Sequence, residues 1–112
     1  MTSKDKKNTM YNSLITRILK GEGKASAEER YAAFSNSGLN EPMKALINKV
    51  ALHPVKILDE DIKEAITSGF TEDQIFELII CGAVGQAARQ YESALDALAK
   101  ATNKEDTEDD TA

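Results

Sequence analysis

The chain has 112 residues, of which 41% are hydrophobic, and this size and composition fit one ordinary globular domain. Its formal net charge of −5 is carried mostly by residues 104–112, which contain five acids and one lysine, so the rest of the chain is close to neutral and no nucleic-acid partner is expected. The most apolar run, residues 75–84, is far shorter than the roughly 20 residues of a membrane span, so no membrane partner is expected either.

The first residues, MTSKDKKNTM, lack the apolar segment of a secretory signal, and we expect residues 1–8 to be disordered. A helix is predicted from near Thr9 to the residue before Gly21, because apolar residues recur on one side at helical spacing: Tyr11, Leu14, Ile15, Ile18 and Leu19. Residues 21–24, GEGK, are predicted to be a linker. They are not a phosphate-binding loop, since no strand precedes them and Ala25 stands where serine or threonine is required.

Two shorter helices are predicted next, over residues 26–35 and residues 40–53. The first has the serine and glutamate spacing of a capping box, beginning at Ser26. For the second we expect Asn40 to be the N-cap, followed by an acid and a proline in the first turn. This helix should end by residue 53 because Pro54 disfavours helical geometry in the residue before it.

A fourth helix is predicted to start with Asp59 as its N-cap and to close at Gly69 in a left-handed conformation. The fifth helix has the clearest start, because Thr71 and Gln74 have capping-box spacing and apolar residues flank them. Its apolar period continues to about Lys100, and residues 104–112 are predicted to be a disordered acidic tail.

The predicted fifth helix is too long for a compact domain of this size. About 30 residues correspond to about 45 Å, against an expected domain diameter of about 30 Å. Either the helix bends at Gly82 or Gly85, or part of it packs on another subunit. We favour the second reading, which predicts a homo-oligomer assembled through the long C-terminal helix.

Four segments together resemble the carboxymuconolactone decarboxylase family, in its alkylhydroperoxidase D-like branch: AAFSNSG, ALINKVALH, LDEDIKEAITSGF and TEDQIFELIICGAVGQAARQYESALDAL. The resemblance covers about residues 28–100 of a single helical domain predicted over residues 9–103. It implies an all-α, alkylhydroperoxidase D-like bundle of about five helices with a long C-terminal helix. It also implies a tendency to assemble.

The chain departs from the family pattern at the redox motif. Redox members carry a Cys-x-x-Cys-x-x-x-His segment, whose positions fall here on Pro54, Ile57 and Asp61. Proline and isoleucine cannot form a thiolate or a disulfide, so thiol peroxidase or disulfide reductase chemistry is excluded at this place. We therefore expect a non-catalytic, self-assembling or small-molecule-binding scaffold, with no cofactor and no metal. The alternative is a thiol-independent acid–base enzyme of the decarboxylase type.

The single cysteine, Cys81, lies in apolar company and is expected to be an unreactive core residue, which also fits a reducing cytoplasm. The candidates for acid–base chemistry are His53, Asp61, Glu77 and Arg89. Glu77 and Arg89 interrupt the apolar fifth helix twelve residues apart, so each needs water or a partner from elsewhere. An ion pair across helices or subunits is one interpretation of them, and catalysis is the other.

A closed pocket lined by His53 and an acid would favour the enzyme. Filling of that region by Ile57, Ile62 and Phe70 would favour the scaffold.

Overall fold

The computed structural model describes the backbone of residues 3–111 and the side chains of residues 6–102. The described chain is all helical with a long C-terminal helix, which confirms the predicted fold class. In chain order the elements are α1 (Ser3–Lys20), α2 (Ala27–Ser35), α3 (Met43–Leu52), the 3-10 turn η1 (Pro54–Lys56), α4 (Asp59–Thr67) and α5 (Glu72–Thr111). Among these described helices, none combines the length and the hydropathy that crossing a membrane requires.

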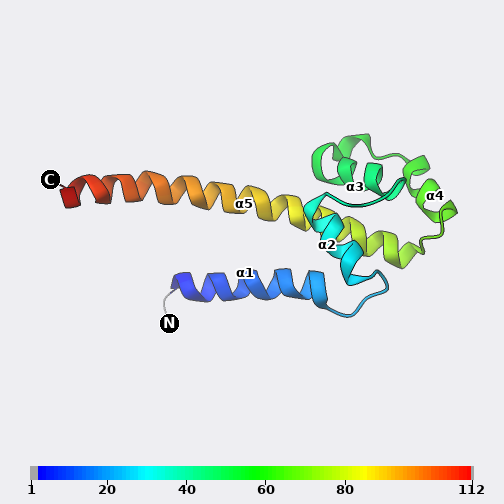
Figure 1. Cartoon of the computed structure of the whole chain (residues 1–112), viewed down its shortest axis with the longest axis horizontal. Helices are drawn as coiled ribbons and strands as arrows, with labels where there is room; N and C mark the ends of the chain where they lie inside the picture. The colour runs from blue at the N-terminus through cyan, green and yellow to red at the C-terminus, as the bar shows by residue number, and fades with distance from the viewer. Residues whose placement is uncertain (1–2, 112) are drawn as a thin grey trace.

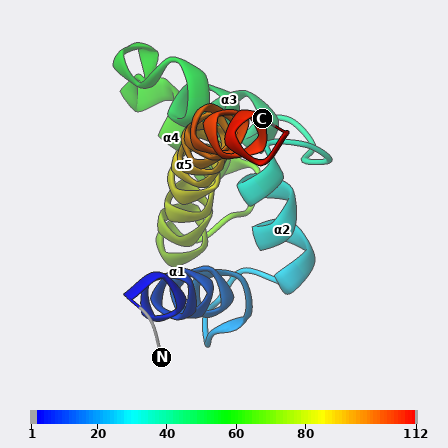
Figure 2. The ribbon, with the colours of Figure 1, turned by 90° about the vertical axis from the view of Figure 1, so that its left-hand side faces the viewer.

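The first part of α5 is the centre of the helical body, and the other helices are arranged around it. α2 and α3 make the most extensive contacts with α5. Seen along the long axis, α1 lies on one side of α5, α3 and α4 lie on the other, and α2 flanks it (Figure 2). The later part of α5 projects away from the body, and α1 runs beside it on the same side (Figure 1).

The molecule is therefore elongated. Its principal extents are 64 × 29 × 21 Å and its radius of gyration is 18.0 Å, whereas a compact chain of this length would have a radius of gyration near 13 Å. We call the projecting part of α5 from Tyr91 onward, together with α1, the arm, and the remainder the body. The arm is the part that gives the molecule its length.

The core lies in the body, where α2, α3, α4 and α5 meet. Its largest fully buried side chains are Met43, Leu46, Ile47, Leu78 and Cys81. Partly buried apolar residues pack against this cluster, including Ile57 from the α3–α4 connection, Ile62 from α4 and Phe70 from the α4–α5 loop. Because burying one such side chain contributes about 1.5–3 kcal/mol, this cluster is the main source of stability in the body.

The strongest local signals in the sequence form the expected structures. Ser26 Oγ accepts from the Glu29 N–H at 3.0 Å, and the Glu29 carboxylate reaches back to the Ser26 N–H at 3.3 Å. Thr71 and Gln74 form the same reciprocal pair at the start of α5, at 3.1 and 2.9 Å. Gly69 has φ of 112° and closes α4 in the left-handed region, as predicted.

The predicted N-caps of α3 and α4 are wrong. The N-cap of α3 is Pro42, and the first amides are served by main-chain carbonyls, with the Lys44 N–H donating to the Asn40 oxygen at 2.9 Å. A side-chain cap from Asn40 is therefore not needed. At α4 the N-cap is Leu58, because the Asp61 carboxylate accepts from the Leu58 N–H at 2.8 Å and the helix starts one residue earlier than expected.

The outer ends of α1 and α5 also differ from the prediction. α1 begins at Ser3 rather than near Thr9, and α5 continues past Lys100 to Thr111. The prediction followed the apolar residues, whereas a helix can extend through polar residues that make no contact with the core. α5 is one helix through both of its glycines, Gly82 and Gly85. The side chains of residues 1–5 and 103–112 lie outside the described part of the chain, and the predicted disorder of residues 1–8 and 104–112 stays a prediction.

Candidate functional site

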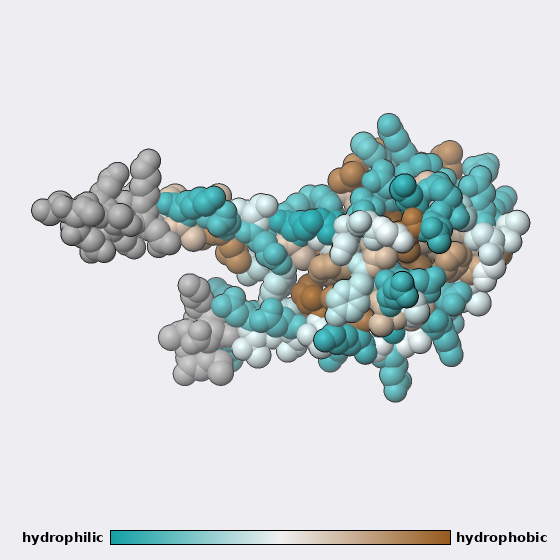
Figure 3. Space-filling view, in the orientation of Figure 1, coloured by the Kyte–Doolittle hydropathy of each residue, from teal (hydrophilic) through white to brown (hydrophobic). Residues whose placement is uncertain are grey.

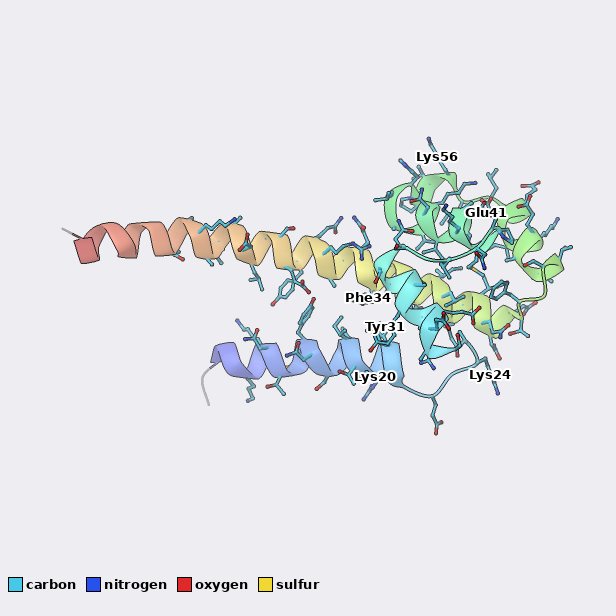
Figure 4. The ribbon with its side chains drawn as sticks, viewed as in Figure 1. Lys20, Lys24, Tyr31, Phe34, Glu41 and Lys56 are labelled. Carbon is cyan, nitrogen blue, oxygen red and sulfur yellow. The ribbon has the colours of Figure 1, made fainter. Side chains whose placement is uncertain are left out.

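The linker between α1 and α2 is held by a carboxylate from α5. The two oxygens of Glu77 accept from the Lys24 N–H at 2.7 and 2.9 Å, and one of them accepts from the Ala25 N–H at 2.6 Å. Figure 4 shows Lys24 on this linker, beside the first turns of α5. Glu77 therefore fixes the chain just before α2 begins, through backbone amides rather than through an opposite charge.

Arg30, on α2, holds the carbonyl side of the same linker. Its Nε donates to the Ala25 carbonyl at 3.2 Å and its Nη1 to the Gly21 carbonyl at 2.6 Å. It is 9% exposed and is the buried charged residue of the described chain. The sequence analysis did not single it out, although Arg30 lies three residues before Ala33 and so falls on the buried face of α2.

The far end of α2 is held by Arg89. Its Nη1 donates to the Phe34 carbonyl at 2.6 Å, and its Nη2 donates to Gln86 Oε1 at 3.0 Å. Gly85 lies one turn earlier, and a Cβ at that position would overlap the same Phe34 carbonyl oxygen. The labelled Phe34 lies where α2 crosses α5 in Figure 4. α2 thus packs closely on α5 at this end.

The expectation that Glu77 and Arg89 find partners outside their own helix is confirmed. Within the described chain neither residue forms an ion pair, and an ion pair across subunits stays a prediction. Among the described side chains, the partners of both residues outside α5 are backbone groups at the two ends of α2. The charged groups of Glu77 and Arg89 form strong hydrogen bonds with backbone amides and carbonyls that have no partner within a helix.

A cavity of 170 Å³ lies between α1, α2 and α5 and brings Arg30, Glu77 and Cys81 together. The Cys81 side chain is 1% exposed, and its Sγ lies 3.8 Å from the Ile18 carbonyl oxygen. Burial raises the pKa of the Cys81 thiol; the Glu77 charge raises it further and the Arg30 charge opposes this. A thiol in this environment stays protonated near neutral pH and is a poor nucleophile.

The other two candidates lie at the α3–α4 connection. His53 is exposed and is the C-cap of α3, where its backbone N–H donates to the Lys49 carbonyl at 2.8 Å. The Asp61 carboxylate forms an ion pair with Lys49 Nζ at 2.9 Å. The hydrogen bond from the Leu58 N–H, and then the one from Lys49, lower the pKa of Asp61. Asp61 therefore joins α3 to α4.

The four predicted site residues do not converge. Glu77 binds the linker before α2, Arg89 binds the end of α2, and Asp61 binds Lys49 and Leu58. His53 is not among the residues that line the cavity beside Cys81. At the α3–α4 connection Ile57 packs against the core, as does Ile62 on α4, whereas Val55 and Leu58 are exposed. This arrangement supports structural roles for Asp61, Glu77 and Arg89.

Within the described residues, no three side chains of histidine, cysteine, aspartate or glutamate are grouped so that they could hold a metal ion. Comparison of the chain with protein-family models, with curated proteins and with solved structures gave no match. What the chain does is therefore inferred from its own residues.

Proposed function

We propose that this chain is a carboxymuconolactone decarboxylase-like helical scaffold that has lost the redox thiol pair and assembles with copies of itself in the cytoplasm. The positions of the family thiols hold Pro54 and Ile57, and Cys81 is buried with a raised pKa. Glu77 and Arg89 of α5 are engaged in holding the linker before α2 and the end of α2. These features support a structural rather than a catalytic role.

The observation that carries the proposal is the uncovered apolar surface of the arm. On α1, Met10 and Leu14 are 69% and 51% exposed. On α5, Leu95 and Leu98 are 41% and 60% exposed. Aliphatic side chains repeated along two neighbouring helices, away from the core, are typical of a surface that another protein covers.

The proposal predicts that the purified protein is not a monomer. Size-exclusion chromatography with light scattering at micromolar concentration should give a dimer or a larger assembly. The physical reason is that a domain this small buries little surface alone, and that its arm has apolar residues left to bury. A single species with the mass of one chain would contradict the proposal.

The absence of redox and acid–base chemistry is tested separately. Thiol-dependent consumption of peroxide should be absent, and turnover that Cys81→Ser abolishes would contradict the scaffold. His53→Ala and Asp61→Asn should leave any cellular phenotype of the protein intact. Loss of that phenotype in either well-folded variant would favour the thiol-independent acid–base enzyme instead.

A further inference from the structure

The buried guanidinium of Arg30 has no opposite charge beside it. Its hydrogen bonds leave from Nε and Nη1 and end on the carbonyls of Ala25 and Gly21. The ion pairs found among the described side chains do not include Arg30. An arginine cannot lose its proton in a protein, and a buried charge is costly unless an opposite charge or further hydrogen bonds compensate it. The two carbonyl dipoles compensate the charge of Arg30 only in part.

The remaining nitrogen of this guanidinium, Nη2, is open to the cavity between α1, α2 and α5. Within the described residues, Nη2 of Arg30 has no hydrogen-bond partner. Each fully buried nitrogen or oxygen of the described side chains does have one, so Nη2 is not fully buried. Arg30 lines the cavity that also borders Cys81. Nη2 therefore presents two N–H donors that a molecule in the cavity can use.

Part of the cavity lining is apolar. Ile18 of α1 and Ile80 and Cys81 of α5 contribute to it. In the space-filling view, apolar surface lies where the inner end of α1 meets the body (Figure 3). The cavity has a volume of 170 Å³, and about 150 Å³ is enough for a molecule of the size of benzene. An apolar lining with a few polar donors is typical of sites for small organic molecules.

The other charged residues at the cavity bear on which charge a ligand should carry. Arg17 adds a second guanidinium, whereas Glu22 and Glu77 are acidic. The carboxylate of Glu77 already accepts from two linker amides, which offset its negative charge. Arg17 and Glu22 are exposed, so water weakens the field of both. The buried charge that lacks compensation is that of Arg30, and it favours an anion with a single charge.

We propose that the cavity between α1, α2 and α5 binds a small organic monocarboxylate. The carboxylate accepts from Nη2 of Arg30, because a planar guanidinium matches the two oxygens of a carboxylate. A short hydrocarbon chain lies against Ile18, Ile80 and Cys81. The site goes beyond the proposed scaffold and does not depend on self-assembly, since one copy of the chain supplies the whole lining.

The first test compares molecules of similar size and different charge, namely butanoate, neutral butanamide and cationic butylammonium. In titrations followed by NMR of the nitrogen-labelled protein, butanoate should bind with a dissociation constant on the order of millimolar or below. Its binding should be at least about ten-fold tighter than that of the other two molecules. The Nε–H signal of Arg30 should shift during the titration, since this group belongs to the guanidinium that the carboxylate contacts.

Three results of these titrations would overturn the monocarboxylate site. Equal binding of butanamide would show that the charge of Arg30 is not used. Tighter binding of butylammonium would show that Glu22 and Glu77 determine the charge of the ligand. Binding of inorganic phosphate as tight as that of butanoate would show that the apolar lining makes no contribution.

The second test locates the site with a matched pair of substitutions. Ile80→Phe adds a larger side chain to the cavity lining, and it should raise the dissociation constant of butanoate at least about ten-fold. Ile66→Phe makes the same change on α4, where the side chain is 46% exposed and outside the cavity, and should have no effect. Unchanged binding in Ile80→Phe, or equal losses in both variants, would overturn the location.

Arg30→Gln tests the buried charge itself. This variant should lose the preference for butanoate over butanamide. Because Arg30 also holds the linker, circular dichroism must first show that the variant is folded, and if it is not, Ile80→Phe decides. Absence of binding by butanoate to the unaltered chain would overturn the site and leave self-assembly untouched. A chain that is monomeric but binds butanoate would contradict self-assembly and leave the site standing.

Discussion

At the residue scale, three charged side chains of this protein bind backbone groups instead of each other. Glu77 accepts from two amides of the linker, Arg30 donates to two of its carbonyls, and Arg89 donates to the carbonyl of Phe34. Backbone groups near helix ends lack partners within the helix, and leaving them unpaired in a partly buried place is costly. These side chains therefore stabilise the path of the chain around α2.

Glu77→Gln should reduce stability. The amide keeps one oxygen acceptor but replaces the other with a nitrogen that cannot accept from the linker N–H groups, and the negative charge is lost. We expect the free energy of unfolding to fall by roughly 2 kcal/mol, the scale of a hydrogen bond to a charged group. Urea unfolding followed by circular dichroism measures this value. The control is Glu64→Gln on the exposed surface of α4, and equal effects of the two changes would contradict the role of Glu77.

Asp61 should make the stability depend on pH. Its pKa is lowered from an ordinary value of 3.8 by the Leu58 amide and by Lys49. Because the folded-state pKa is below the unfolded-state one, the stabilisation is fully present above the unfolded-state pKa and is lost as pH falls through the folded-state pKa. Asp61→Asn should therefore be less stable than the unaltered chain at neutral pH, and the difference should shrink in acid. A difference that does not change with pH would show that the carboxylate charge is not the cause.

At the element scale, α5 serves as the surface on which α2 is positioned. Gly85 permits the end of α2 to approach the α5 backbone, while Gly82 faces the side chain of Ile47. Mid-helix glycines reduce helix stability by about 1 kcal/mol each relative to alanine. At Gly85 this cost is offset by a backbone contact that no other residue permits.

Gly85→Ala should be strongly destabilising, although the same change in an exposed helix is usually favourable. The new methyl group would overlap the Phe34 carbonyl and would separate α2 from α5, with a loss of about 3 kcal/mol in the free energy of unfolding. Gly82→Ala is the matched control, since its methyl group would lie 3.0 Å from Ile47 Cγ2, an atom of a side chain that can adjust. Thermal unfolding of both variants tests the order, and a Gly85→Ala variant as stable as Gly82→Ala would contradict the close approach.

The sequence predicted those elements whose signals are local. The capping residues at the starts of α2 and α5 and the glycine that closes α4 act within three or four positions, so their roles could be inferred from spacing. The caps of α3 and α4 could not, because at α3 the main-chain carbonyl of Asn40 accepts instead of its side chain, and at α4 the ion-paired Asp61 accepts from the Leu58 N–H instead of Asp59 serving as the cap. The partners of Glu77 and Arg89 lie 52 to 55 residues away in the chain. The spacing of residues along the chain does not reveal partners so far away. Glu77 and Arg89 could therefore be recognised as unusual in an apolar helix, but their hydrogen-bond partners could not be predicted.

At the scale of the whole molecule, the body and the arm differ in what stabilises them. The body has a buried apolar core. In the arm Leu19 is buried at the inner end of α1 and Tyr11 contacts Tyr91 and Glu92, while Leu95 and Leu98 on α5 are exposed. The outer part of the arm therefore contributes little to the buried core of the chain.

Deletion of residues 104–112 tests whether the acidic end of the chain contributes to the stability of the body. The melting temperature of the body should be nearly unchanged when it is measured at a concentration where the chain is monomeric, because the core contacts lie elsewhere. Thermal unfolding followed by circular dichroism measures this temperature. A large fall in the melting temperature of the monomer would mean that the tail docks on the body.

Recognition of the linker through its amides and carbonyls has a consequence for how this sequence can diverge. Since Glu77 and Arg30 bind backbone atoms, which every residue except proline possesses in full, the side chains at positions 22 and 24 are free to vary among the other residues without moving α1. Gly21 and Gly23 are the exceptions, because a side chain at Gly21 would collide with the Arg17 carbonyl and one at Gly23 with the Glu77 carboxylate. In distant descendants of this chain, the carboxylate, the guanidinium and these two glycines should persist together while the neighbouring linker residues change.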